Sequence, residues 1–186
     1  MSFKAKALLL FEAFEQGCIQ TDLQPDKVQD YALSDGWEIQ SLAQDETHDS
    51  SEWNKFIKGE GVVWLRLVSA PIRSEKRAGH ACAVAALRGY VDEEKHLAVI
   101  EAREMISMLE ERPYASEITW VNPGLINLKE GYEDNGGAAF LTMAPQGHEN
   151  MVMSYGVIES ENLISHFLGA VPRWWVEDMR ESRSAE

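Results

Sequence analysis

The sequence has few cysteines and no long apolar run, and each shortage excludes a class of protein. Its 186 residues include two cysteines, Cys18 and Cys82, far apart and without the close spacing of a metal site. No apolar segment approaches the roughly 18 residues needed to span a bilayer. The apolar run 7–11 follows two lysines, but Glu12 and Glu15 interrupt it too early for a signal peptide. We therefore expect a cytoplasmic protein with reduced thiols, while a disulfide between the two cysteines stays open.

Basic residues are also scarce, since 17 lysines and arginines face 31 acidic residues and the net charge is −14. Such a field repels nucleic-acid phosphates and anionic membranes, so neither is an expected partner. It attracts a basic protein, although high net charge also serves solubility alone. The one basic cluster is Arg73, Lys76 and Arg77 in segment 71–78, where we expect an exposed hairpin loop.

No catalytic or cofactor motif is recognisable in the chain. The pair Gly136-Gly137 lacks the lysine and following helix of a phosphate-binding loop. His80 and Cys82 would be neighbours on one face of a strand, which makes them candidates for a base and nucleophile or for two metal ligands. A third group is not visible at fixed spacing, and a buried structural cysteine explains the pair as well. We expect no cofactor and no metal.

The strongest structural signal is a strand followed by a helix. Residues 80–87 alternate between two faces, as a strand does. Asp92 is placed to cap a helix, and Pro113 ends it. The apolar side of that helix is formed by Ala98, Ala102, Met105, Ile106 and Leu109.

The remaining segments complete the expected architecture. Helices are predicted at 3–16, ending at Gly17, at 25–36, at 49–57 and at 160–169; strands at 62–68, 118–121, 125–128, 138–143 and 151–157; a tight hairpin turn at 134–137; and a frayed tail from about 177. Strands in runs rather than in strict alternation with helices indicate the α+β class. We predict one α+β domain over residues 1–186, with a mainly antiparallel sheet, a long helix packed on one face, and N-terminal helices.

The tryptophans suggest a binding role, because exposed aromatic residues are enriched at binding sites. Trp64, Trp174, Trp175 and Tyr155 are the candidate partner contacts, although the C-terminal tryptophans would equally clamp the last segment onto the core. We prefer a non-catalytic acidic binding protein, of adaptor, regulatory or immunity type, that acts through protein–protein contact. Its partner is then a basic protein, or a second copy in a homodimer. The alternative is an enzyme or small-ligand protein with a pocket between sheet and helix, using His80, Cys82, Trp64 and Tyr155.

Overall fold

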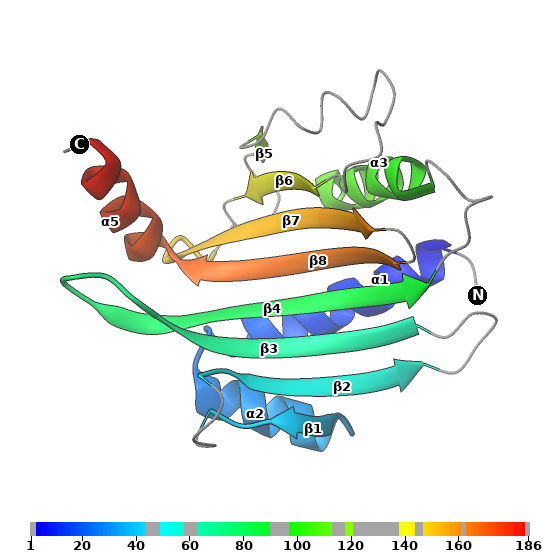
Figure 1. Ribbon diagram of the computed structural model, residues 1–186, viewed down its shortest axis with the longest axis horizontal. Helices are drawn as coiled ribbons and strands as arrows, with labels where there is room; N and C mark the ends of the chain where they lie inside the picture. Colours follow the sequence, from blue (N-terminus) through cyan, green and yellow to red (C-terminus); the bar gives the residue numbers. More distant parts are fainter. Residues whose placement is uncertain are drawn as a thin grey trace.

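The fold is organised around one antiparallel sheet (Figure 1). The computed structural model describes residues 3–43, 49–57, 63–89, 97–112, 118–120, 138–143, 147–160 and 163–184. Its strands are β1 (Glu38–Ser41), β2 (Ser51–Ile57), β3 (Val63–Arg73), β4 (Ala78–Gly89), β5 (Ile118–Trp120), β6 (Ala138–Met143), β7 (Met151–Ser160) and β8 (Leu163–Pro172). The predicted α+β class with a mainly antiparallel sheet is confirmed.

The sheet consists of two meanders joined at their last strands. The order is β1-β2-β3-β4-β8-β7-β6-β5, so β1 to β4 form one meander and β5 to β8 the other. The junction is the antiparallel pair of β4 and β8, in which Ala83 lies opposite Gly169. The two halves of the chain therefore share one sheet, and its central strands come from residues far apart in the sequence.

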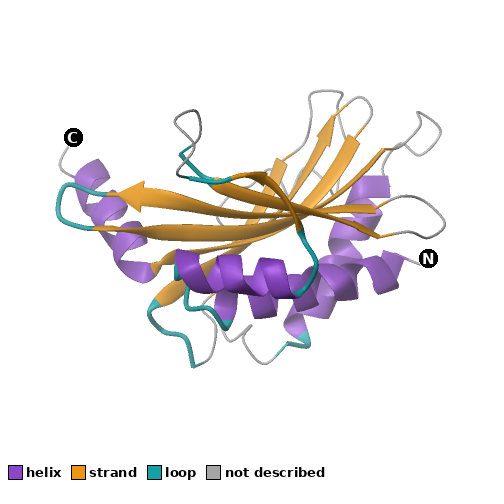
Figure 2. Cartoon of the chain, turned by 90° about the horizontal axis from the view of Figure 1, so that it is seen from below, coloured by secondary structure: helices purple, strands orange, loops and turns teal. Residues whose placement is uncertain are grey.

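Helices from both halves cover the same face of this sheet (Figure 2). They are α1 (Phe3–Phe14), α2 (Pro25–Ser34) and α3 (Leu97–Glu110), whereas α5 (Arg173–Ser184) lies at one end of the sheet. The alternation of each strand sends one set of side chains toward the helices. The core between these layers includes Phe11, Phe14, Leu67, Met105 and Leu168.

The first helix does not end at Gly17 as predicted. α1 continues into a π-helical turn, η1 (Glu15–Ile19), that contains this glycine. A Cβ atom at Gly17 would lie 2.9 Å from the ring of Tyr31, so the residue is small because α2 packs closely against it. Close approach of two elements, rather than helix termination, explains the glycine here.

The expectation of reduced thiols is wrong in this structure. Cys18 on η1 and Cys82 on β4 form a disulfide, with a Cα–Cα distance of 5.5 Å. Both residues are fully buried, so the bond ties the end of the first helical segment to a central strand. Disulfides persist mainly in oxidising compartments. The cysteines therefore no longer support the prediction of a cytoplasmic location.

Two predicted helices are strands. In the segment 49–57, the residues Ser51–Ile57 form β2, in which Trp53 is buried against the helices while Phe56 faces the other way. Pairing with β1 and β3 on both sides overrides the helical spacing of its apolar residues. In the segment predicted as the last helix, 160–169, the residues from Leu163 onward belong to the central strand β8, and Ser160 ends β7. The short strand β1 was not predicted at all.

The predicted frayed tail is also wrong, because residues up to Ser184 belong to α5. The basic hairpin anchors this helix: Asp178 accepts a hydrogen bond from Ser74 at 2.6 Å and pairs with Arg77 at 3.3 Å. Lys76 pairs with Glu181 at 2.9 Å. The hairpin loop is shorter than predicted. Of the three basic residues in the predicted cluster, Lys76 and Arg77 pair with α5.

Other predictions have mixed outcomes. The strands expected at 62–68, 80–87, 118–121, 138–143 and 151–157 are all present; the strand at 138–143 has the predicted bounds, and the others have shifted ends. The cap at Asp92, the strand at 125–128 and the hairpin at 134–137 lie outside the described residues. Among the helices that the structure describes, none is long and apolar enough to cross a membrane.

Candidate functional site

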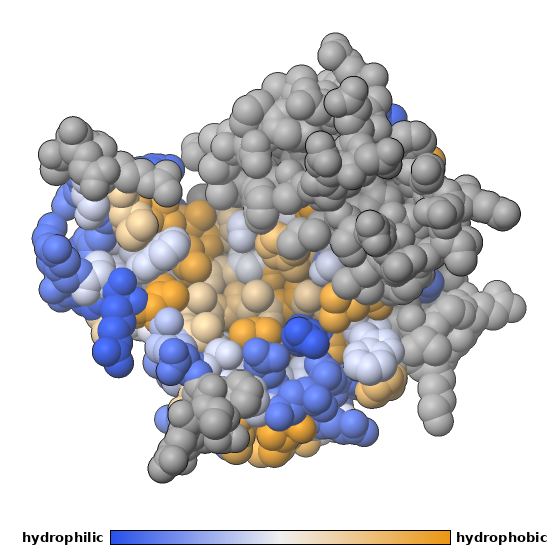
Figure 3. All heavy atoms as spheres, viewed as in Figure 1, coloured by the Kyte–Doolittle hydropathy of each residue, from blue (hydrophilic) through white to orange (hydrophobic). Residues whose placement is uncertain are grey.

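One face of the sheet remains largely uncovered by the described helices. Of these helices, α5 reaches this face, at its end, where Trp174 lies against Gly79. We call this side the open face. Its centre carries small or apolar side chains, and Figure 3 shows the apolar surface there. The described residues of the open face in β3, β4, β8 and β7 include Trp64, Arg66, Val68, Ala70, Ile72, Gly79, Ala81, Ala83, Ala85, Leu87, Ser165, Phe167, Gly169, Val171, Val152, Ser154 and Gly156.

An exposed aromatic pair borders the small side chains at the centre of the open face. Phe56 on β2 and Trp64 on β3 lie opposite each other, with ring centroids 4.2 Å apart. Their exposed fractions are 45% and 41%. Arg66, two residues further along β3, is also exposed and forms no ion pair with any residue in the described ranges. Within the described residues, the open face thus combines small apolar side chains with the cation Arg66, which has no ion-pair partner among them.

The predicted partner contacts have different positions. Trp64 is exposed on the open face, and its role stays a prediction. Trp174 is half-buried against Gly79, with the Arg77 guanidinium 5.6 Å from the centroid of its ring, and Trp175 is half-buried on the same helix. Tyr155 is fully buried on the helix-covered face, so its assignment as a partner contact is wrong.

The His80–Cys82 hypothesis is also wrong as a nucleophile and base. The Cys82 sulfur belongs to the disulfide and is buried, so no thiolate is available to attack a substrate. The same bond removes the cysteine as a metal ligand. Within the described residues, no group of three or more acidic, histidine or cysteine side chains is arranged to hold a metal ion.

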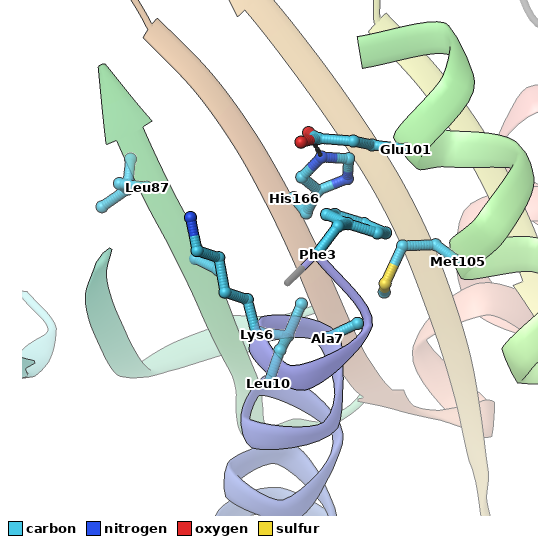
Figure 4. A pocket seen from close by; sticks show the side chains of 9 residues that line it. Phe3, Lys6, Ala7, Leu10, Leu87, Glu101, Met105 and His166 are labelled. Atoms are coloured by element: carbon cyan, nitrogen blue, oxygen red, sulfur yellow. Dashed lines mark hydrogen bonds and ion pairs between the residues drawn. The ribbon is translucent and has the colours of Figure 1, made fainter. Parts of the chain in front are cut away.

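A pocket opens on the helix-covered side, between α1, α3, β4 and β8 (Figure 4). Its volume is about 330 Å³ including the open mouth. Its lining residues are Phe3, Lys6, Ala7, Leu10, Ala86, Leu87, Glu101, Met105 and His166. This is the type of pocket that the alternative hypothesis expected, although Tyr155 is the one candidate that lies near it, behind His166.

A buried polar chain lies at the wall of this pocket. The Nδ1 atom of His166 is 2.9 Å from the Tyr155 hydroxyl, and its Nε2 atom is 2.8 Å from Oε2 of Glu101. All three side chains are buried. Because a carboxylate only accepts, the imidazole Nε2–H donates to Glu101, and Nδ1 of the neutral ring then accepts from the hydroxyl. The chain therefore couples α3 to β8 and β7 through the ring of His166.

Tyr155 makes the fold sensitive to alkaline pH. Burial, and then the nearby Glu101 carboxylate, raise the pKa of Tyr155 well above its ordinary value. The folded protein keeps this proton at a pH where the unfolded chain, with a tyrosine pKa of about 10, releases it. The stabilisation is thus complete below about pH 10 and is lost as the pH rises above that value.

We expect the urea midpoint of the wild type to fall between about pH 9 and 11. The Tyr155→Phe variant should show a weaker fall, because it has no buried phenol to ionise. Some pH dependence should remain from Tyr31, whose pKa is also raised by burial and by Asp35. If the urea midpoints of the wild type and the variant fell equally steeply with pH, Tyr155 would not be the source of this pH dependence.

Sequence reasoning missed His166 and Glu101. The alternation Ile164, His166, Leu168, Ala170 in β8 has the period of a strand, and all four residues are buried. The histidine at a core position hid that period, because it interrupts the apolar series. A polar residue at such a position is the one signal in the sequence that could have indicated a buried polar contact.

A second, more polar pocket, of about 410 Å³ including its open mouth, lies between α1, α2, β2 and β3. Its centre is Asp35, whose Oδ2 accepts from Lys55 at 2.7 Å, from Trp37 at 3.0 Å and from Tyr31 at 3.2 Å. Burial acts to raise the pKa of Asp35, but hydrogen bonds from Lys55 and Trp37 outweigh it and leave the pKa below its ordinary value. These groups satisfy one another, so anchoring of α2 on β2 accounts for the cluster.

Comparison with known proteins finds no relative of this chain. The chain matches no protein-family model, no curated protein and no solved structure. Functional inference therefore rests on the open face and the pocket themselves.

Proposed function

We propose that the protein is a non-catalytic binding protein whose protein partner docks an apolar segment on the open face of the sheet. The observation that supports this proposal is the strip of small side chains beside the exposed pair Phe56 and Trp64. Small residues let a partner backbone approach closely, and an adjacent aromatic pair supplies the large apolar contact area of a hot spot. An adaptor, a regulatory subunit or an immunity-type protein would use such a surface.

Charge favours a basic partner with a local acidic group. The net charge of −14 attracts a basic protein at long range and makes the association weaker at high salt. The guanidinium of Arg66, which pairs with no acid in the described ranges, lies on the open face itself, so a carboxylate of the partner fits there. The two effects are compatible, because steering depends on total charge and docking depends on the local pair. We retain the cytoplasm, expected from the sequence, as the proposed location, and the buried Cys18–Cys82 disulfide is the observation that counts against it.

Native mass spectrometry of the protein purified gently from its own cells tests the proposal. We expect wild type to retain a protein partner at low salt, and Trp64→Ala to lose it, with the dissociation constant raised tenfold or more, as for a hot-spot residue. Leu33→Ala is the matched control, since Leu33 is 49% exposed but lies on α2, on the other side of the sheet.

The control variant should bind as wild type does. Loss of binding in Leu33→Ala but not in Trp64→Ala would place the interface on the helical side and overturn the proposal. A homodimer that Trp64→Ala splits would identify a second copy as the occupant. Absence of any complex at low salt would contradict a binding function through this face.

A further inference from the structure

The small side chains of the open face lie between two aromatic rings. On one side the ring of Phe167 lies over Gly156, where a Cβ atom would collide with it. On the other side the ring of Trp174 lies over Gly79, 2.9 Å from the position that a Cβ atom would take. We call the surface between these rings the central band. It includes Val68, Ala70, Ala81, Ala83, Gly169 and Ser154.

The central band has the dimensions of one α-helix. Strand pairing places Arg66, Ala85 and Phe167 in one row across the sheet, and Ile72 and Gly79 in another. Along β3 the two rows are about 20 Å apart, so a helix of roughly 10–12 Å diameter fits between their side chains. Across β3, β4, β8 and β7 the band measures about 14 Å, which is the length of roughly three helical turns.

The backbone of the central band offers no free hydrogen bond to a partner. β3, β4, β8 and β7 each pair with a neighbouring strand on both sides. A partner segment on this face must therefore satisfy its own N–H and C=O groups. An α-helix does so within one segment, whereas a single extended strand leaves them unpaired. Saturated pairing of the sheet thus favours a helix as the occupant.

An unsatisfied polar group lies beside the band. Asn54 on β2 is opposite Arg66 and therefore projects from the same face. It is 5% exposed, and its Oδ1 atom accepts no hydrogen bond from any described residue. Glu38 and Glu52 lie on this face as well, but neither forms an ion pair with Arg66. A buried acceptor without a donor is rare in folded proteins and points to a ligand that completes the group.

We infer that the docking segment of the partner is an amphipathic α-helix that lies on the central band and places a carboxylate on Arg66. This inference rests on the proposed function, because it names the occupant of the same face. Large apolar side chains of the helix fill the space above Ala81, Ala83 and Gly169. Two of the five N–H groups of the guanidinium hold the carboxylate, and another donates to Oδ1 of Asn54.

Two synthetic peptides of identical composition separate a helix from an extended segment. Both consist of leucine and lysine with one glutamate near each end; the leucines recur with the helical period in one peptide and alternate in the other. Equal charge gives both the same long-range attraction to the acidic protein. By calorimetry the helical peptide should bind about tenfold or more tightly, with a rise in helical circular dichroism. Tighter binding of the alternating peptide, or no binding of either, overturns the inference.

A variant that fills the central band locates the binding. Ala83→Phe should weaken binding of the helical peptide about tenfold or more, because the added ring occupies the space of its leucines. Ala81→Leu serves the same purpose if Ala83→Phe does not fold. Ala43→Phe is the matched control, since Ala43 is exposed beyond the end of the outer strand β1. It should bind as wild type does.

The same variants separate the two proposals. If the alternating peptide binds more tightly and Ala83→Phe abolishes that binding, the open face is still the docking surface and only the helix is wrong. If Ala83→Phe changes the binding of neither peptide, the peptides do not use the central band. That result contradicts the inference and also counts against the proposed function.

The pairing with Arg66 has its own test. A second helical peptide carries glutamine in place of both glutamates. The affinity ratio of the glutamate peptide to the glutamine peptide should be about threefold to fivefold higher for wild type than for Arg66→Gln, as for an exposed ion pair at the upper end of its range. Arg103→Gln, at an exposed position of α3, should keep the wild-type ratio. Equal ratios for wild type and Arg66→Gln would overturn the pairing.

Discussion

Removing the disulfide should lower the free energy of unfolding by about 4 kcal/mol, the value that loop-closure entropy predicts for a 64-residue separation. The bond joins Cys18 to Cys82, so without it the unfolded chain gains the freedom of the whole segment between η1 and β4. For a chain of this size such a loss lowers the melting temperature by roughly 10 °C. The measurement is a denaturant melt of the oxidised protein, the reduced protein and the Cys18→Ala/Cys82→Ala variant.

Reductant should have no effect on the double variant, which is the control for effects on other groups. Both sulfurs are buried, so reduction of the native protein should be slow and should speed up in mild denaturant. Equal midpoints for oxidised and reduced protein would contradict a stabilising role. A thiol count on protein from its own cells also tests the predicted cytoplasmic location, since a reducing compartment keeps thiols free.

The His166→Leu variant should lose about 3 kcal/mol of stability, which is the usual cost of breaking a buried pair from one side. Leucine fills a similar volume, so the loss comes from polar groups rather than from a cavity. The variant leaves the Tyr155 hydroxyl and the Glu101 carboxylate buried without the imidazole between them. Urea denaturation at pH 7 measures the difference.

A triple variant distinguishes mutual satisfaction from simple packing. In Tyr155→Phe/Glu101→Leu/His166→Leu the whole polar chain becomes apolar, and replacement of a complete buried pair is often neutral or stabilising. We therefore expect the triple variant to be more stable than His166→Leu alone. If the losses of the three single variants add up in the triple variant, the three groups do not act as a unit.

The strands that were predicted correctly share one property. In β3, β4 and β7 the apolar side chains alternate without interruption over several residues, so local pattern alone indicates the element. The α+β class followed from the order of these elements. For β2 the spacing of Trp53 and Phe56 fits a helix as well as a strand, and pairing with two neighbouring strands decided the outcome.

The candidate sites depended even more on tertiary structure. His166 comes from β8 and Glu101 from α3, 65 residues apart, and their contact cannot be read from local spacing. The exposure of Trp64 could be predicted because strand alternation places it opposite the core, and its role as a partner contact stays a prediction. Tyr155 is also aromatic, but its side chain faces the core. When both faces of a strand carry apolar residues, the sequence pattern does not show which face is buried.

The sequence by itself determined the fold class, the acidity, the two N-terminal helices and most strands, because hydrophobic periodicity and composition are properties of neighbouring residues. The tertiary structure alone decided that Cys18 reaches Cys82, that Asp178 receives the basic hairpin, and that His166 lies between Tyr155 and Glu101. These outcomes require two distant segments to meet. That meeting is set by the packing of α1, α3 and α5 on a sheet shared by both halves of the chain.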